Sequence, residues 1–464
     1  MHIFRLTHAE EMGLSSTALL KFFEQHRDLG IHSLAVVRQH KVLALSVGPW
    51  QEDLPHVLFS LSKSFCSMAA GIAVDEGLIR WDESVADVLK ASLPKGYDRR
   101  LHDVQLRHLL SMSSGLDPRS DTRSLRARKD WARTVLGYRV LHEPGTVFHY
   151  NTLGTYLAGR MVASRTGEPL RDYLMPRLFG PLDIAKPQWD CCPLGHNTAG
   201  FGLRLSCLDI AKIAQLLLDR GMWNGQRLLS ESYLDLATTK QVDNGGNKTN
   251  EAPDWAQGYG FQFWMSRHGR YRGDGMYGQV MLVDQRRDLA LAVTAGLNDM
   301  GAEMDALHQL MDDLIKLPAG SKKEQAAQKS LPRSLVVPPP TDDGSPLFGE
   351  GSYISQGHLL RLEIQGPDRM RLFLKPKGAP WPACLTFQRG VPYTGEYDPF
   401  VYGDGPSRYE GSLGVQDGVL TLRALMPQAP FTLHVRIRTA GTGLHVELEG
   451  VHFLQGTFHF KIAG

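Results

Sequence analysis

The chain has 464 residues, of which 42% are hydrophobic and 22% charged, an ordinary composition for a soluble globular protein and a length that predicts two domains. Its 51 basic and 49 acidic residues give a formal net charge of +2 without a long run of one sign, so we expect neither nucleic acid nor a membrane as a partner. The N-terminus lacks the apolar run of a signal peptide, no stretch reaches membrane-spanning length, and five cysteines are an odd number for a disulfide framework. We therefore expect a cytoplasmic protein with buried, reduced thiols.

The first 316 residues mix β-prone runs with helical periodicity. Strands are expected over 33–39, 41–47, 279–283 and 289–295, and helices over 60–77, 153–166, 208–220 and 301–316. Strands at both ends with helices between them predict one antiparallel sheet flanked by helices, formed from the two termini, with an inserted helical lobe. The expected fold class of this first domain, residues 1–316, is therefore α/β (α+β).

The composition changes after residue 316. Residues 317–345 are rich in Pro, Ser, Gly, Lys and Gln and include three consecutive prolines, which predicts a partly extended linker. From 346 to 464, hydrophobic and polar residues alternate in segments such as HLLRLEIQG, RMRLFLK and LHVELEG, with turn residues between them. This pattern predicts an all-β domain, a small barrel or sandwich. The second domain shows no constellation of Ser, His and acid, so we expect the chemistry in the first.

The first chemical signal is Ser60-x-x-Lys63, at the start of an expected helix. Residues i and i+3 share a helical face, so the lysine amine can reach the serine hydroxyl, and the helix N-terminus favours negative charge near Ser60. A free serine hydroxyl is a poor nucleophile. Lys63 helps only if burial keeps its amine partly neutral or if it lowers the pKa of a neighbour. The same spacing also occurs by chance in many helices.

The second signal is Tyr150, which a Pro-Gly turn in EPGTVFHYNT delivers on a short extended stretch ahead of a helix. A tyrosine near a lysine can lose its phenol proton and act as a general base; a packed aromatic is the alternative. The neighbouring His149 would point to the opposite side of the stretch, and Asp117 lies in a turn, so both are interpreted as structural.

The third signal is YGFQFW at 259–264, followed by YRGDGMYGQVMLVD at 271–284. A glycine-rich strand would let a substrate lie close against it. The N–H of Met276, which follows Gly275, would join that of Ser60 in an oxyanion hole. A plain β-bulge or turn is the alternative.

The order of these motifs, together with RHLLSMSSGLD (107–117) and SCLDIAKIAQLLLDRGMWNGQRLL (206–229), resembles the class C β-lactamase family of serine hydrolases. That superfamily includes penicillin-binding carboxypeptidases, D-aminopeptidases, esterases and β-lactamases. The resemblance covers roughly residues 15–316. It implies an α/β sandwich plus a helical lobe, with the active site between them.

The resemblance also implies roles for individual residues. Ser60 would be the acylated nucleophile, Lys63 and Tyr150 would share the proton transfer, and the N–H groups of Ser60 and Met276 would bind the oxyanion. The positions that correspond to the substrate-binding motifs of the family are Thr152, Gly273, Asp274 and Gly275.

Two departures from the family pattern bear on specificity. The second motif is often Tyr-x-Asn, whereas this chain has Thr152 in the third place, and the third motif is often Lys-Thr-Gly or His-x-Gly, whereas this chain has Gly273-Asp274-Gly275. A basic residue in the third motif would grip a substrate carboxylate, so its loss argues against an efficient β-lactamase or carboxypeptidase. Arg270 or Arg272 could substitute or could be solvated, and His268-Gly269 could be a shifted basic motif.

Together the motifs look most like the esterase and 6-aminohexanoate-dimer hydrolase branch, so we expect hydrolysis of a small-molecule ester, amide or lactam through an acyl-enzyme on Ser60. A β-lactamase or D-amino-acid peptidase is one alternative, and a non-catalytic penicillin-binding sensor, acylated without turnover, is another. No cofactor is expected, and the eighteen histidines show no metal-ligand spacing, so no metal is expected either. The second domain resembles, more loosely, lipocalin-like appendages of some family members. It could cover the active-site mouth, hold protomers together in a homo-oligomer, or stabilise the first domain.

Overall fold

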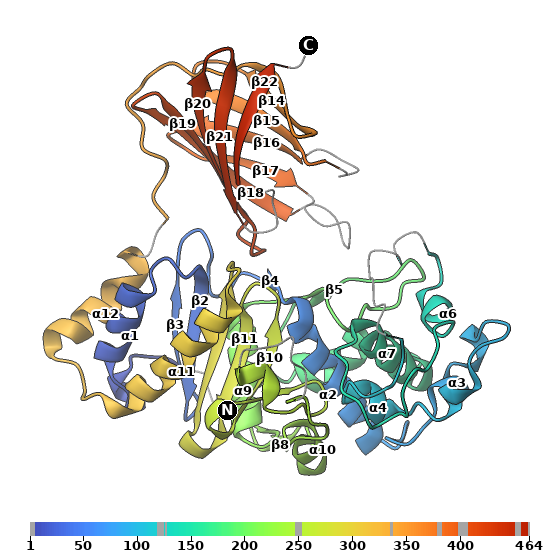
Figure 1. Ribbon diagram of the computed structural model, residues 1–464. Coiled ribbons are helices and arrows are strands. Elements are labelled where there is room, and N and C mark those ends of the chain that lie inside the picture. Colours follow the sequence, from blue (N-terminus) through green and yellow to red (C-terminus); the bar gives the residue numbers. More distant parts are fainter. Residues whose placement is uncertain are drawn as a thin grey trace.

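A computed structural model describes residues 5–117, 125, 128–245, 253–334, 337–377, 383–397, 407–450 and 456–462. It contains a larger domain of mixed helices and strands and a smaller domain of strands (Figure 1). The smaller domain stands over one side of the larger one, and the chain passes between them in an extended trace (Figure 1).

The larger domain is built on a seven-stranded sheet with strand order β1-β3-β2-β12-β11-β10-β9. Neighbouring strands are antiparallel except β1 and β3, which are parallel. The strands span Arg5–Leu6 (β1), Ile31–Arg38 (β2), Lys41–Ser46 (β3), Trp264–Ser266 (β9), Arg270–Gly275 (β10), Gln279–Asp284 (β11) and Leu289–Ala295 (β12). Strands from both ends of the domain meet where β2 pairs with β12, which confirms the expected sheet with its inserted lobe.

Both faces of this sheet are covered by helices. Successive side chains of a strand point to opposite faces. On β2, Val36 packs in the apolar cluster of helices α1 (Ser16–Gln25) and α11 (Met300–Lys316), whereas Ala35 belongs to the cluster that contains α9 (Cys207–Leu218). The uninterrupted apolar run along β2 therefore reflects a strand buried on both sides.

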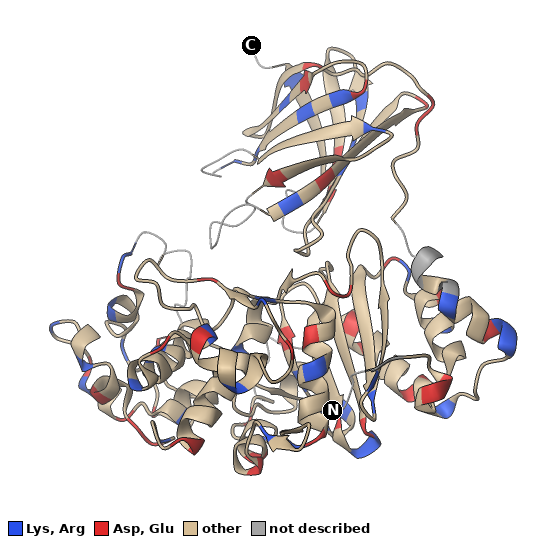
Figure 2. Cartoon of the chain, turned by 180° about the vertical axis from the view of Figure 1, so that it is seen from behind, with Lys and Arg blue, Asp and Glu red and all other residues tan. Residues whose placement is uncertain are grey.

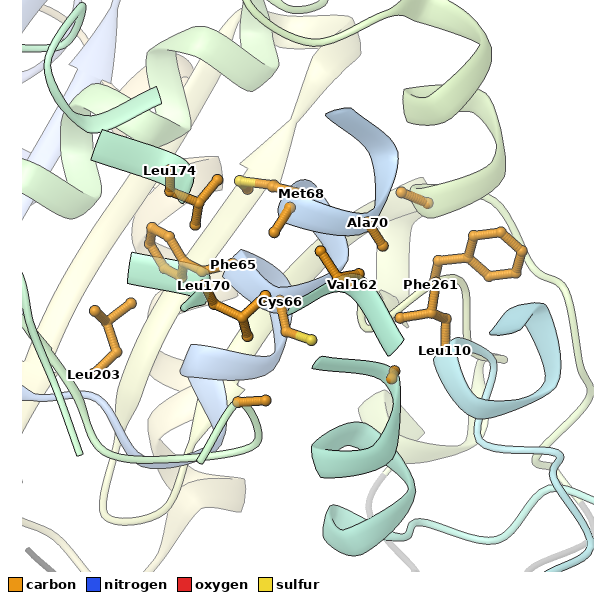
Figure 3. Close-up of a cluster of buried hydrophobic side chains, with 14 of the residues drawn as sticks. Phe65, Cys66, Met68, Ala70, Leu110, Val162, Leu170, Leu174, Leu203 and Phe261 are labelled. Atoms are coloured by element: carbon orange, nitrogen blue, oxygen red, sulfur yellow. The ribbon is translucent and has the colours of Figure 1, made fainter. Parts of the chain in front are cut away.

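Helix α2 (Ser62–Asp75) lies inside the larger apolar cluster, with twelve of its fourteen residues buried. Figure 3 shows Phe65, Cys66 and Met68 of this helix among apolar side chains from other elements. A helix that is apolar on every side is expected inside a domain. The remaining α-helices described between β3 and β9 are α3 (Val85–Val88), α4 (Leu106–Leu110), α6 (Trp131–Val135), α7 (Thr152–Thr166), α8 (Leu170–Leu174) and α10 (Glu231–Ala237).

The segment 317–345 differs from the expected extended linker. Helix α12 (Lys322–Ser334) occupies its middle and packs on α1, where Thr17 Oγ1 donates a hydrogen bond to Glu324 Oε1 over 3.0 Å. The Gly320 N–H donates to Glu10 Oε1 over 3.2 Å. Lys, Glu, Gln and Ala are good helix formers, so the expectation of a linker was wrong for this stretch. Residues 337–345 have no regular secondary structure.

The smaller domain is an all-β barrel, as expected. Ten strands follow one another in the order β16-β15-β14-β13-β22-β21-β20-β19-β18-β17, and β16 also pairs with β18, which closes the sheet. They span Gly351–Ser355 (β13), His358–Ile364 (β14), Arg369–Lys375 (β15), Ala383–Arg389 (β16), Tyr393–Tyr397 (β17), Ser407–Gln416 (β18), Val419–Leu425 (β19), Thr432–Ala440 (β20), Gly443–Gly450 (β21) and Gly456–Ile462 (β22). Alternate residues such as Leu360, Leu362 and Leu372 are buried in its interior. The barrel therefore has a packed apolar core.

Charged side chains of both signs are interspersed over the two domains (Figure 2). Among the helices that the structure describes, none is both long and apolar enough to cross a membrane. Of the five cysteines, Cys66, Cys192 and Cys207 are buried, whereas Cys191 and Cys384 are exposed. The expectation of buried thiols was therefore wrong for two of the five. Cys384, for example, lies at an outward-facing position of β16.

Candidate active site

Ser60 and Lys63 lie at the entrance to helix α2. Ser60 belongs to a single 3₁₀ turn, Phe59–Leu61, which runs directly into the helix. Lys63 Nζ lies 2.8 Å from Ser60 Oγ and donates a second hydrogen bond to the carbonyl oxygen of Gly200, also over 2.8 Å. The i, i+3 spacing thus brings amine and hydroxyl together, as the sequence predicted.

The amine of Lys63 is buried, with the residue 1% exposed. Burial lowers its pKa from 10.5 to about 7, against opposing effects of the Asp274 carboxylate and the Cys66 thiol. An amine with a pKa near 7 is uncharged in a large fraction of molecules at neutral pH, and an uncharged amine can accept a proton. This is the condition under which a lysine can activate a serine hydroxyl.

Tyr150 lies beside this pair, immediately before helix α7. Its ring centroid is 4.9 Å from Lys63 Nζ, and the ring stacks on Trp264 with a centroid distance of 5.4 Å and an interplanar angle of 16°. The helix begins there because the Asn151 side chain accepts hydrogen bonds from the first free N–H groups of the helix. The structure therefore brings Ser60, Lys63 and Tyr150 into one cluster.

The phenol of Tyr150 keeps its proton at neutral pH. Burial raises its pKa above the usual value of 10, and the nearby Asp274 raises it further, whereas interactions with the Ser60 hydroxyl and with Arg272 oppose the rise. The sequence suggested that this tyrosine could act as a base. In the free protein the uncharged, proton-accepting form is therefore populated at neutral pH for Lys63 and not for Tyr150, so the amine is the available base and the phenol carries a proton that it can pass on.

The glycines of strand β10 pack against the segment that carries Ser60. A side-chain carbon at Gly275 would lie 2.1 Å from the Leu58 carbonyl oxygen, and one at Gly273 would lie 2.5 Å from Ser64 Oγ. These glycines therefore let β10 pack closely on α2 and the turn before it, and the expectation that a substrate lies against the strand stays a prediction. Their close approach places Met276, which follows Gly275 and has a 55% exposed side chain, next to the Ser60 turn.

Asp274 is paired rather than free. Its Oδ2 lies 3.0 Å from Arg272 Nε and 2.9 Å from Arg272 Nη2, and both side chains are buried. Arg272 Nη1 also donates to Ser266 Oγ over 2.6 Å and to the Asp254 carbonyl oxygen over 3.1 Å. The side-chain charges of Asp274 and Arg272 therefore balance each other locally.

The other basic residues near this strand do not reach Ser60. Arg270 is fully buried and pairs with Asp284 and Asp312 over 2.9 and 2.6 Å. The idea that Arg270 or Arg272 could be solvated is wrong, since both have no exposed side-chain surface. His268 lies in the turn before β10, at the opposite end of the strand from Gly275, so the shifted basic motif is wrong as well.

Thr152 is the first residue of helix α7. A side-chain carbon at Gly200 would lie 2.9 Å from Thr152 Cγ2, so this threonine packs against the residue whose carbonyl binds Lys63.

In the part of the chain that the structure describes, no group of three His, Cys, Asp or Glu residues is arranged to hold a metal ion. The cluster of Ser60, Lys63 and Tyr150 contains the nucleophile, amine and phenol of a serine–lysine site.

Residues 20–314, well over half of the chain, match the protein family described as Beta-lactamase. The chain belongs to the beta-lactamase family. Its members include hydrolases of amides and esters, and the matched segment contains Ser60, Lys63, Tyr150 and Met276.

Two curated relatives and one solved structure illustrate the range of the beta-lactamase family. A 6-aminohexanoate-dimer hydrolase of Paenarthrobacter ureafaciens is 25% identical over 261 residues, which are 51% of this chain and 64% of the relative, less than two thirds of its length. Penicillin-binding protein 4 of Amycolatopsis lactamdurans is 25% identical over 313 residues, 60% of this chain and 81% of the relative. The solved structure of SurE with D-Leu has a TM-score of 0.52 at 20% identity, and the match covers 95% of this chain and 98% of that one. The likeness to SurE, which concerns the fold alone, extends over both domains.

Sequence reasoning missed two residues of this beta-lactamase family site. Gln262 is buried, and its side-chain amide donates to the carbonyl oxygen of Leu110 over 2.7 Å and accepts from Thr155 Oγ1 over 2.9 Å. Its main-chain carbonyl oxygen accepts a third hydrogen bond, from Ser64 Oγ, over 2.8 Å. It thus ties α2, α4 and α7 together behind the site. Trp264 supports the ring of Tyr150. Both belong to the quoted YGFQFW segment, whose aromatic run was the only available signal.

Proposed function

We propose that the protein is a serine hydrolase that cleaves an ester or amide through an acyl-enzyme on Ser60. The observation that carries the proposal is the 2.8 Å approach of Ser60 Oγ to a buried amine whose pKa is lowered to about 7. Membership of the beta-lactamase family and the similarity to an amide hydrolase support the same reaction class.

In the proposed mechanism, the uncharged amine of Lys63 accepts the Ser60 proton as Oγ attacks the substrate carbonyl. The N–H groups of Ser60 and Met276 stabilise the negative charge that develops on the carbonyl oxygen. The protonated phenol of Tyr150 donates a proton to the leaving group and recovers it through Lys63. Water then attacks the acyl-enzyme along the same proton path in reverse, which releases the acid and restores Ser60.

The charge around strand β10 favours substrates without a free carboxylate. Gly273 offers no cation, and the guanidinium of the adjacent residue, Arg272, is buried and already paired with Asp274. An anchoring charge contact is worth about 1.5–3 kcal/mol, so its absence costs about ten- to a hundredfold in kcat/KM for a carboxylate-bearing substrate. We therefore propose neutral or amine-bearing acyl groups, and the β-lactamase and peptidase alternatives gain no support from the site.

A fluorophosphonate probe tests the nucleophile. Peptide mass spectrometry should place the adduct on Ser60, and Ser60→Ala should lose both labelling and turnover of a chromogenic short-chain ester. Ser67→Ala is a matched control, because it removes a buried hydroxyl of the same helix that accepts a hydrogen bond from Tyr233 over 3.0 Å. Labelling at another serine would remove the assignment, and stoichiometric acylation without turnover would favour the sensor.

Paired substrates test the specificity. Two esters that differ only in a carboxylate or its amide should be hydrolysed with kcat/KM in favour of the amide-bearing member. If the carboxylate member is preferred and Arg272→Ala abolishes that preference, the guanidinium binds substrate and the β-lactamase or peptidase alternative replaces this proposal.

A further inference from the structure

The loop between barrel strands β19 and β20 is buried against the larger domain. We call residues 426–431 the docking loop. Loops between strands usually face water, yet Met426, Ala429 and Phe431 are each at most 1% exposed. The indole N–H of Trp50 donates to the Met426 carbonyl oxygen over 2.9 Å, and the Val57 N–H donates to the Gln428 carbonyl oxygen over 3.1 Å. Figure 1 shows a barrel loop that points at the edge of the larger domain near β4 (His56–Val57).

Hydrogen bonds hold the docking loop from within, and the larger domain leaves room for its backbone. Within the loop, the Met426 N–H donates to the Phe431 carbonyl oxygen and the Ala429 N–H donates to the Met426 carbonyl oxygen, each over 3.1 Å. Opposite it, a side-chain carbon at Gly296 would lie 2.4 Å from the Pro430 carbonyl oxygen. Only a glycine lets the loop approach this closely. The position of the Phe431 ring is therefore fixed relative to the larger domain.

The ring of Phe431 contacts two residues that adjoin the proposed oxyanion hole. Its centroid lies 6.3 Å from that of Phe59 and 5.8 Å from that of Tyr277, with interplanar angles of 88° and 79°. Phe59 and Tyr277 contact each other at 5.4 Å and 77°. Three mutually edge-to-face rings form a favourable aromatic cluster. Phe59 directly precedes Ser60, and Tyr277 directly follows Met276.

The backbone at both residues needs such support. Phe59 has a φ of 46° and Tyr277 a φ of 66°, in the left-handed region that bulky L-residues rarely adopt. Strained conformations of this kind persist only where the surrounding structure holds them, and they cluster at functional sites. The Ser60 N–H belongs to the peptide group that directly follows Phe59, and the backbone at Tyr277 fixes the turn that directly follows Met276. One phenylalanine of the barrel therefore contacts both strained residues that flank the proposed oxyanion hole.

We propose that Phe431 is a positioning residue for the oxyanion hole, acting through Phe59 and Tyr277 from the second domain. The inference rests on the proposed function, because it takes the N–H groups of Ser60 and Met276 as the donors. It makes the barrel a working part of the active site, since the hole keeps its geometry only while the docking loop is seated.

Two substitutions in the full-length protein disrupt the packing of the docking loop, one in the barrel and one in the larger domain. Phe431→Ala removes the ring. Gly296→Ala places a methyl group 2.4 Å from the Pro430 carbonyl oxygen and 2.8 Å from the ring of His32, and none of its three nearest neighbours belongs to the three aromatic rings. Each should lower kcat for a Ser60-dependent ester about 10- to 100-fold while KM changes less than about threefold, because the hole acts mainly in the transition state. Phe431→Leu, which keeps most of the apolar volume for folding, should be intermediate. Ile462→Ala removes an exposed side chain of the same barrel and should change nothing.

Hydrogen exchange supplies a readout that does not depend on turnover. Amides of residues 59–61 and 276–278 should exchange faster in both variants and at the wild-type rate in the control. Faster exchange with unchanged kcat overturns the proposal, and so does a raised KM with unchanged kcat, which would make Phe431 a substrate contact. If the wild type shows no Ser60-dependent turnover, the proposed function fails by itself, and exchange alone then decides whether Phe431 holds these two segments.

Discussion

Hydrolysis by this protein should slow steeply below pH 7, because Lys63 must be uncharged to accept the proton of Ser60. Burial lowers the pKa of Lys63 from 10.5 to about 7. At pH 7 an ordinary lysine is uncharged in about one molecule in 3,000, whereas Lys63 is uncharged in about half of the molecules. Below the pKa each pH unit removes about nine tenths of the uncharged form. At pH 5 kcat/KM should therefore be about 1% of its plateau value.

The assay is the kcat/KM of a neutral chromogenic ester from pH 5 to pH 9, with tryptophan fluorescence to verify that the protein stays folded. Lys63→Arg keeps a charge at every pH, so it should be nearly inactive throughout. Tyr150→Phe should lower the plateau but leave the limb near pH 7, since the phenol is protonated over the whole range. A kcat/KM that still rises about tenfold per pH unit up to pH 9, or a rise near pH 7 that Lys63→Arg retains, would refute the assignment of the base.

Further predictions concern stability and packing. Burial raises the pKa of Glu303 to about 8, so the folded protein keeps a proton that the unfolded chain loses above about pH 4.5, and the stability of the fold should decline between these two pH values. The Tm of Glu303→Gln should therefore rise relative to the wild-type Tm as pH increases from 5 to 8. A Tm difference that does not change with pH would contradict this. Burial lowers the pKa of His56 from 6.5 to about 4, so on acidification the unfolded chain takes up a proton before the folded protein does, and stability should fall as pH falls from about 6.5 to 4. The Tm of His56→Gln should fall less over this pH range than the wild-type Tm. An equal fall of the two Tm values would count against this reasoning. Gly275→Ala should lower kcat at least about tenfold, because the added methyl group would lie 2.1 Å from the Leu58 carbonyl oxygen. Gly154→Ala is the control, because a methyl group there would have no neighbour closer than 3.7 Å, and its kcat should stay unchanged. Equal losses of kcat in the two variants would exclude the clash as the cause.

The sequence was informative where the determining interactions are local. The spacing of Ser60 and Lys63 fixes their approach because both lie on one helical turn, and the apolar run of β2 predicts a strand whatever its partner. The same holds for the alternating segments of the barrel, such as β14 and β15. These features need no knowledge of distant contacts.

The failures involve residues whose environment is set by distant parts of the chain. In the sequence Arg272 could be a substrate anchor or a solvated charge, and Asp274 was expected at a substrate-binding position. In the structure β10 is buried and both side chains lie on one face of the strand, so they pair. Helix α12 was hidden by the prolines and serines that follow and surround it. Its partner Thr17, and Glu10, which binds Gly320 just before the helix, lie some 300 residues earlier. The docking loop is a short turn-like segment with no periodicity, so no pattern in it indicates burial.

The pairing of β2 with β12 has a consequence for how the chain is made. Val36 and Leu291 are partners in the sheet although about 255 residues separate them. At about 5–20 residues per second, a ribosome needs about 12–50 s to synthesise what lies between them. Throughout that interval β2 lacks its sheet neighbour β12, and helix α2 lacks strand β10, against which it packs. Nascent chains that end before residue 289 should therefore expose apolar surface and depend on chaperones. The sheet of the larger domain can be completed only after its last strands have left the ribosomal exit tunnel.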